Sequence, residues 1–332
     1  MSATSSRSNS PSSATTSSTM RSSTPTPADK TTAAWREIAD LEFNLHDELP
    51  NEVFKCLKWD SRGRSKILCY HEDGQAPARA VFSVMARIQD SDKTFCLLPN
   101  GRWDEYKASG NGQFDSKFEN LSLSCVVQRA LPTDRPDGYD LGMSWGHVTK
   151  NIRRLLTPVG DKNPSKWQGL YVDEVSKPSD VDKTLKFTHK LFRLKPKEGF
   201  EEDPNPYAID PALDHSLTRE GWPFKTESLS FHALKGLDKD ATLVPLPAYH
   251  VLNDGSLRAM LPSEYGSLQG ALVQIDFQIS HIHFGGQNKD HFAAEMLRIK
   301  MLQPRVAMGV TSPRKKTRLN NGAAAPVMNP SL

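Results

Sequence analysis

One pentapeptide of this chain has the spacing of a hydrolase nucleophile. Gly142-Met143-Ser144-Trp145-Gly146 fits the pattern G-x-S-x-G, in which a strand delivers a serine to a strained turn and so exposes its hydroxyl to a base. A helix is predicted from His147 onward, but residues 135–140 have the composition of a turn and not of a buried apolar strand. We therefore expect a glycine-rich loop here and no catalytic residue, with a serine hydrolase as the remote alternative.

Three histidines near the C-terminal end have a spacing that could hold a metal. His281 and His283 are two residues apart in a predicted strand, and a symmetric turn at Gln287 would place His291 opposite His283. Three imidazoles on one sheet face are ligands for a transition metal, but no cysteine or glutamate at short spacing completes the set. We expect a polar strand face with no metal. Phosphate-binding glycine loops are also absent, so no cofactor is predicted.

The charged side chains are unevenly distributed. The formal net charge is +3, yet residues 147–197 alone carry twelve basic and five acidic side chains. We call this segment the basic band. Seven of its cations fall on the outer face of a predicted helix, 147–156, and in or beside a predicted strand, 184–194, where aromatic rings are interleaved with them. Cations that contact phosphates, with rings that stack on bases, form single-strand binding surfaces.

The residues predicted to bind nucleic acid through the basic band are Lys150, Arg153, Arg154, Lys186, Phe187, His189, Lys190, Phe192, Arg193 and Lys195. The alternative interpretation is a solvated strand face on which lysines serve solubility and protect a sheet edge.

A second basic cluster lies close to the C-terminus. Four of the five residues from Arg314 to Arg318 are basic, and residues 303–332 contain no Asp or Glu. A dense cluster of cations in a flexible tail resembles a monopartite nuclear-localisation signal, because it is accessible to an import carrier or to nucleic acid. We expect a nuclear or nucleo-cytoplasmic protein whose targeting residues are Arg314, Lys315, Lys316 and Arg318.

The elements that must position these residues are mostly strands. Apolar and polar residues alternate from Val273 to Ser280, and the phase changes at His281. A second strand follows the turn at residues 285–288 and changes phase at Leu297, as a β-bulge or a sharp bend would produce. Further strands are predicted at residues 80–88, 95–98, 121–131, 169–175, 184–194 and 228–234, and helices only at 33–45 and 147–156. The pattern predicts a mainly β protein, barrel- or sandwich-like, with a few helices.

Composition divides the chain into five parts. Residues 1–30, rich in Ser, Thr and Pro, and residues 305–332 are too poor in core-forming side chains to fold, so both are predicted to be disordered tails. Between them, an acidic and proline-rich loop or linker at 198–227 separates two β-rich regions. These are residues 31–197, which contain the basic band, and residues 228–304, which contain the long C-terminal hairpin.

Together these features favour a non-enzymatic nuclear protein that binds nucleic acid, single-stranded in particular, through the basic band. The alternative is an interaction scaffold that binds protein partners of unknown identity, with the basic tail serving only as a nuclear address. No signal-peptide pattern and no run near the ~20 apolar residues of a membrane helix occurs, so no membrane partner is expected.

Overall fold

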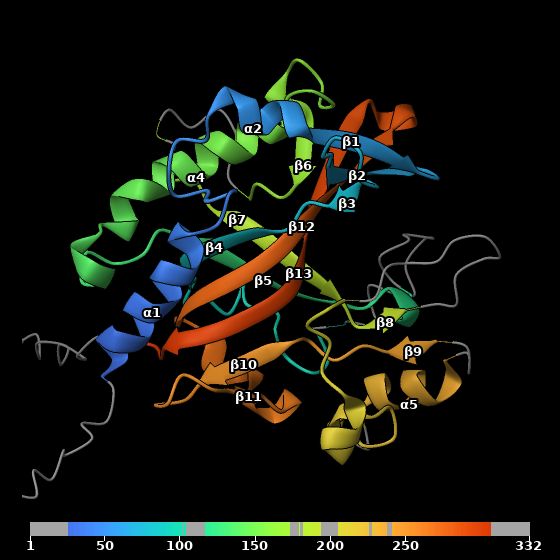
Figure 1. Ribbon diagram of the computed structural model, residues 1–332. Helices are drawn as coiled ribbons and strands as arrows, with labels where there is room; N and C mark the ends of the chain where they lie inside the picture. Colours follow the sequence, from blue (N-terminus) through green and yellow to red (C-terminus); the bar gives the residue numbers. More distant parts are fainter. Residues whose placement is uncertain are drawn as a thin grey trace, which may run out of the picture.

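The centre of the molecule is a closed barrel of strands. The computed structural model describes residues 26–101, 103, 117–172, 179, 182–193, 205–225, 228–237 and 241–306. The barrel strands are β4 (Phe82–Ile88), β5 (Ser122–Gln128), β7 (Leu185–Lys190), β12 (Leu272–Phe284) and β13 (Lys289–Gln303) (Figure 1). Their order is β12-β4-β5-β7-β13, and pairing of β13 with β12 closes it. All neighbours are antiparallel except β7 and β13. The predicted mainly β, barrel-like fold is confirmed.

The barrel strands belong to a larger sheet. β1 (Leu57–Arg62) and β2 (Ser65–Tyr70) form an antiparallel hairpin, and β2 pairs with the distal part of β12. The other strands are β3 (Ala78–Arg79) on β2, β6 (Trp167–Gly169) and β10 (Ala248–Val251) on β13, β11 (Leu257–Ala259) on β10, and a separate pair, β8 (Phe192–Arg193) with β9 (Thr242–Leu243). Both predicted β-rich regions therefore supply strands to the same barrel.

Helices pack around this sheet. The α-helices are α1 (Pro27–Ala39), α2 (Asn51–Cys56), α4 (Leu141–Leu156) and α5 (Leu229–Gly236). Short 3-10 helices are η2 (Phe118–Asn120), η3 (Pro136–Gly138), η4 (Pro164–Lys166), η6 (Pro211–Leu213), η7 (His215–Leu217), η8 (Pro262–Leu268) and η9 (Gly285–Gln287). α4 buries Trp145, Val148 and Ile152 in the core cluster that fills the barrel. No helix among the residues described above is long and apolar enough to cross a membrane.

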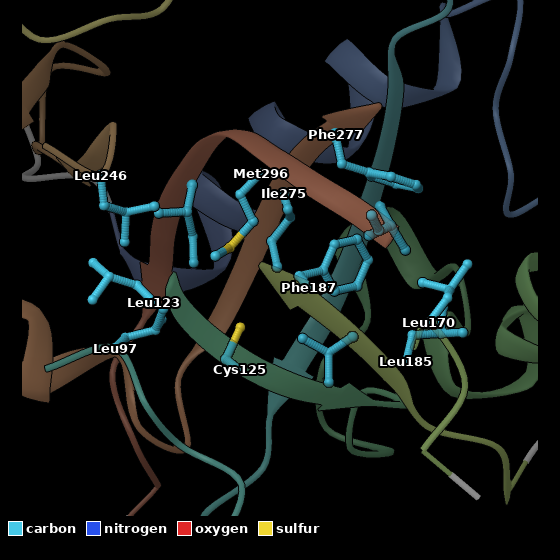
Figure 2. Close-up of a cluster of buried hydrophobic side chains, with 14 of the residues drawn as sticks. Leu97, Leu123, Cys125, Leu170, Leu185, Phe187, Leu246, Ile275, Phe277 and Met296 are labelled. Carbon is cyan, nitrogen blue, oxygen red and sulfur yellow. The ribbon is translucent and has the colours of Figure 1, made fainter. Parts of the chain in front are cut away.

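The barrel interior is filled by its own side chains. Figure 2 shows Phe187, Phe277, Ile275 and Met296 within one cluster of buried side chains, with Cys125 below them, and each is at most 1% exposed. The rings of Phe187 and Phe277 meet edge to face, 4.9 Å between centroids. Small barrels are closed by side chains in this way and enclose no channel. A ligand of this barrel must therefore bind on its outside.

The phase change predicted in the last strand is a β-bulge. In the pairing of β12 with β13, Phe277 lies opposite Met296 and Asp276 lies opposite Arg298, so Leu297 is an extra residue on β13. An extra residue shifts the alternation by one position and bends the strand. The change of phase at Leu297 is confirmed.

The phase change predicted at His281 has a different cause. The register of β12 continues unshifted through this point, and His281 keeps the inward direction of the apolar residues before it. Ile282 and Phe284 are on the outer face. From His281 onward, the inward face of β12 carries polar residues and the outward face carries apolar ones, because the distal part of β12 extends past the filled interior of the barrel. The prediction of a bend or bulge at His281 is wrong.

Three other segments differ from the sequence-based expectation. Residues 228–234 form helix α5 and no strand, because Ser228 caps the helix by accepting a hydrogen bond from the Phe231 amide, 3.2 Å. Helix α1 starts at Pro27, inside the segment predicted to be disordered, behind a capping box between Thr26 and Asp29. Residues 95–98 form no regular strand, although Cys96 exchanges backbone hydrogen bonds with β5. In the predicted C-terminal tail, Arg305 pairs with Asp90 at 2.7 Å. Residues 1–25 and 307–332 lie outside the described residues.

Candidate nucleic-acid interface

The alternation along β7 divides the predicted basic strand into two faces. Phe187 and His189 point into the barrel and are 0% and 3% exposed. Lys186, Thr188 and Lys190 point outward, the first two half-buried and Lys190 exposed. Strand geometry forces this separation, because successive side chains lie on opposite faces of a sheet. The cations of β7 therefore face solvent, but the rings between them are not available to a base.

The remaining predicted ring is also buried. Phe192 lies in β8, is 3% exposed and packs against Phe118 at 5.3 Å between ring centroids. The His189 Nε2 atom lies 2.9 Å from the carbonyl oxygen of Val244, and burial lowers the pKa of its imidazole. The prediction that Phe187, His189 and Phe192 form an exposed stacking surface is wrong, because all three belong to the core. Arg193 beside them is half-buried.

The outward side chains around Lys186 and Lys190 form what we call the β7 patch. By the pairing register, Ser122 of β5 lies opposite Lys190, Val126 lies opposite Lys186, and Ser124 of β5 and Glu295 of β13 lie on either side of Thr188. Neither lysine makes an ion pair with any residue that the structure describes. The neighbouring carboxylate, Glu295, accepts a hydrogen bond from the Gln278 amide at 2.8 Å. The patch thus presents two cations that make no ion pair among the described residues, next to the small side chains of Ser122, Ser124 and Thr188.

The helical part of the basic band has a different role. The Lys150 ammonium pairs with Glu48 at 2.7 Å. The Arg154 guanidinium donates to the Leu49 carbonyl at 2.9 Å and to the Asn51 side chain at 2.6 Å, and it lies 3.8 Å above the Phe54 ring. Arg153, on the same helix, is half-buried. Lys150 and Arg154 therefore attach α4 to the segment that precedes β1, and the basic band is not one continuous surface.

Ser144 is buried inside helix α4, so the expected loop at residues 142–146 is wrong. Asp140 caps this helix, and the Ser144 hydroxyl donates to the Leu141 carbonyl at 3.1 Å. His46 lies 2.9 Å away through Nδ1, but its Nε2 atom accepts the amide hydrogen of Met85. Nδ1 must then carry the proton and donate it to Ser144, so this imidazole cannot act as a base toward the serine. The geometry opposes the hydrolase alternative.

The three late histidines do not share a sheet face. His281 and His283 both contact one oxygen of the buried Asp290, at 2.8 and 2.9 Å, whereas His291 lies on the opposite face of β13. Burial acts to raise the pKa of Asp290, but hydrogen bonds from both histidines and from the Asp161 amide outweigh it and lower the pKa. Within the described ranges no three His, Cys, Asp or Glu side chains form a group that could hold a metal.

Comparisons with known proteins give weak likenesses only. No family model and no curated protein sequence matches this chain. Among solved structures, it is similar to the single-stranded DNA-binding protein from bacteriophage Enc34, with 8% identity and a TM-score of 0.33 over 77% of this chain and 94% of that one. It is also similar to gp2.5, a single-stranded DNA-binding protein encoded by bacteriophage T7, with 7% identity and a TM-score of 0.30 over 70% and 97%. Likenesses at this level carry no argument about function.

The structure adds a basic surface that the sequence-based prediction missed. Strands β1 and β2 are joined by the two-residue loop Gly63-Arg64, with Gly63 at φ 62°, and the hairpin exposes Lys58, Arg62, Arg64 and Lys66. A glycine at the first position of such a loop is the signature of a type II′ hairpin turn. The dipeptide was the signal that could have predicted this hairpin.

The structure also reveals an exposed ring. Phe284 at the distal end of β12 is 47% exposed, lies opposite Lys289 of β13 and meets His291 edge to face at 6.2 Å. Predicted site residue Lys195 and the predicted targeting residues Arg314, Lys315, Lys316 and Arg318 lie outside the described residues.

Proposed function

We propose that this protein binds single-stranded nucleic acid on the outside of its barrel, with the β7 patch contacting the phosphates. The observation that carries the proposal is the pair Lys186 and Lys190, two cations without ion pairs in the described part of the chain, on a strand whose inner face is fully packed. Phosphates displace counterions from such cations, and this release drives binding. The small side chains beside them leave room for a sugar–phosphate backbone.

The architecture supports the same surface. In five-stranded Greek-key barrels of the OB type, oligonucleotides lie across the second and third strands, flanked by the loops that join strands one to two and four to five. Counted along this barrel, the second and third strands are β5 and β7, and the β12–β13 turn joins the fourth to the fifth. The correspondence is an analogy of architecture, and it supports the proposal only in combination with the outward-facing Lys186 and Lys190.

A stacking ring is the second component of such a surface. Phe284 has this role in our proposal, because its ring is exposed and lies beside the Lys289 side chain at the β12–β13 turn. Stacking of one base on an aromatic ring contributes about 1–3 kcal/mol and tolerates any base. We therefore expect Phe284→Ala to weaken binding by that amount and Phe284→Trp to preserve it, in the same anisotropy assay that tests the lysines.

The binding test uses the full chain with Arg314, Lys315, Lys316 and Arg318 changed to Ala, so that the tail cannot supply the affinity. Binding of a labelled oligothymidine is followed by fluorescence anisotropy as salt is varied. Changing Lys186 and Lys190 to Gln should lower the affinity roughly 50-fold at about 50 mM salt and reduce the slope of log K against log salt by about 1.4, since each phosphate contact contributes about 0.7.

The matched control changes Lys225 and Lys235, two exposed lysines near and on α5, to Gln. This control removes the same net charge and should leave both the affinity and the slope of log K against log salt nearly unchanged. If the tail-neutral protein shows no salt-dependent binding, the nucleic-acid proposal fails, and the protein-binding scaffold takes its place.

We also propose that the C-terminal cluster directs the protein to the nucleus. The proposal is supported by four cations in five residues, with no acidic side chain from 303 to 332. Because a chain of 37.0 kDa is small enough to diffuse through nuclear pores, the test uses a fusion several times larger. Changing Arg314, Lys315, Lys316 and Arg318 to Ala should abolish nuclear enrichment in fluorescence microscopy. Unchanged accumulation would contradict it.

A further inference from the structure

The hairpin β1–β2 carries cations on the same sheet face as the β7 patch. Lys58 and Arg62 alternate with Asp60 on one side of β1, and Arg64 lies in the turn. Arg62 is opposite Ser65, which places both on the outer face beside Ile282 of β12. We call Lys58, Arg62 and Arg64 the hairpin cluster. Lys66 is opposite Ser61 and His281, so its side chain lies on the other face.

The charges of the hairpin cluster are not compensated within the described residues. The nearest acidic side chain on the strand, Asp60, pairs with His71 at 3.1 Å and forms no ion pair with the three cations. All three are exposed. Edge protection explains one lysine on an outer strand such as β1. It does not explain two further arginines at the turn, where no edge is presented for pairing.

A row of uncharged side chains on β13, β12 and β2 lies between the two basic surfaces. Ala293 of β13 precedes Ala294, which pairs with Phe187, and it faces outward as Lys186 does, whereas the Lys186 amide donates to the Leu170 carbonyl at 2.7 Å. Ser280 of β12 pairs with Ala293, and Ile67 of β2 pairs with Ser280. Ala293, Ser280 and Ile67 are all half-buried, with no charged group among them. The row reaches β1 at Asp60, which lies opposite Ile67 and between Lys58 and Arg62. From β7 to β1 this path crosses four strand spacings, or roughly 19 Å at about 4.8 Å per spacing. In Figure 1, β1 and β2 lie beside the distal part of β12.

We propose that the hairpin cluster is a second phosphate-binding site for the same single strand, which runs from the β7 patch across β13 and β12 to the β1–β2 hairpin. The inference rests on the proposed function, and it adds a direction for the bound strand and a minimum length. A strand too short to cross this distance contacts only the β7 patch. A longer one contacts both surfaces, so its binding depends more steeply on salt.

The test compares oligothymidines of about four and about twenty nucleotides, the first at the lower limit of the roughly 4–16 nucleotides known as site sizes for such barrels and the second beyond the upper limit. The protein is the tail-neutral full chain used above. Changing Lys58, Arg62 and Arg64 to Gln should leave binding of the short oligonucleotide unchanged. With the long oligonucleotide, the same three changes should reduce the slope of log K against log salt by about 2. A fourfold rise in salt should then lower the affinity of the variant about 20-fold less than that of the parent.

Two further variants make the outcome specific. A charge-matched control changes Lys66, Lys225 and Lys235 to Gln and should behave like the parent with both lengths. A charge-preserving variant, Lys58→Arg, Arg62→Lys and Arg64→Lys, should keep the steep slope, which separates loss of charge from damage to the hairpin. Thermal melting of each variant reports its folding.

The outcomes separate this inference from the proposed function. If the short oligonucleotide binds through Lys186 and Lys190 but the hairpin variant keeps the parent's slope with the long one, the second site does not exist. If the long oligonucleotide binds no more steeply than the short one in the parent, the proposed path is wrong. If neither oligonucleotide binds the parent, the proposed function itself fails.

Discussion

The two halves of the basic band have similar compositions and opposite surroundings. On α4, Lys150 pairs with Glu48, and Arg154 contacts the Leu49 carbonyl and the Phe54 ring. On β7, Lys186 and Lys190 face outward and make no ion pair within the described ranges. A cation whose hydrogen bonds are already made inside the protein cannot bind a phosphate without first losing them. Charge density along a sequence therefore identifies candidates, and the partners in the fold decide which of them are free.

The largest expected effect concerns the ring under the β7 patch. Phe187 is 0% exposed and packs on Phe277, so Phe187→Ala removes a filled part of the barrel interior. Large-to-small changes of this kind cost about 3–5 kcal/mol of unfolding free energy. Urea unfolding followed by circular dichroism should show this loss of stability. The fraction of Phe187→Ala that remains folded should bind oligothymidine with nearly the parent affinity. A large fall in affinity with unchanged stability would mean that the ring contacts a base after all.

A second effect concerns the contact between α4 and the barrel. His46 lies under α4, and its complete burial lowers its pKa to about 3, with a smaller contribution from His147. The unfolded chain gains a proton below about pH 6.5, whereas the folded imidazole stays neutral, so stability is lost as pH falls from about 6.5 toward 3. The loss from this group at pH 5 is about 2 kcal/mol.

The measurement is the urea midpoint of the parent and of His46→Gln at pH 7 and pH 5. The variant should lose less stability between these pH values, because it has no proton to gain at this position. His232→Gln, at an exposed position of α5, is the control and should leave the pH dependence as in the parent. Equal pH dependence of the parent and of His46→Gln would show that this imidazole is not kept neutral by the fold.

Long-range contacts decide which parts of this molecule could be predicted from the sequence. The alternation in residues 273–303 predicted the long hairpin and its bulge at Leu297, because a strand with one buried face determines its own pattern. The same alternation also separates Phe187 from Lys186 in β7. That Phe192 is buried depends on Phe118, 74 positions away, and no local pattern reports such a contact. The hairpin at Gly63 was missed because its short strands have little apolar alternation.

The smallest expected effect tests the contrast between the two halves directly. Arg154→Gln removes two hydrogen bonds and a cation–π contact that are partly exposed, so we expect a loss of about 1 kcal/mol of stability and no change in affinity. Lys186→Gln should do the opposite: an affinity about eightfold lower at about 50 mM salt, with unchanged stability. Both variants lose one positive charge, so each is the other's control for net charge. If Arg154→Gln weakens binding as much as Lys186→Gln while the protein remains equally stable, α4 belongs to the binding surface and the band is continuous. If only Lys186→Gln lowers the affinity and only Arg154→Gln lowers the stability, the β7 half of the band binds the ligand and the α4 half holds this helix in place.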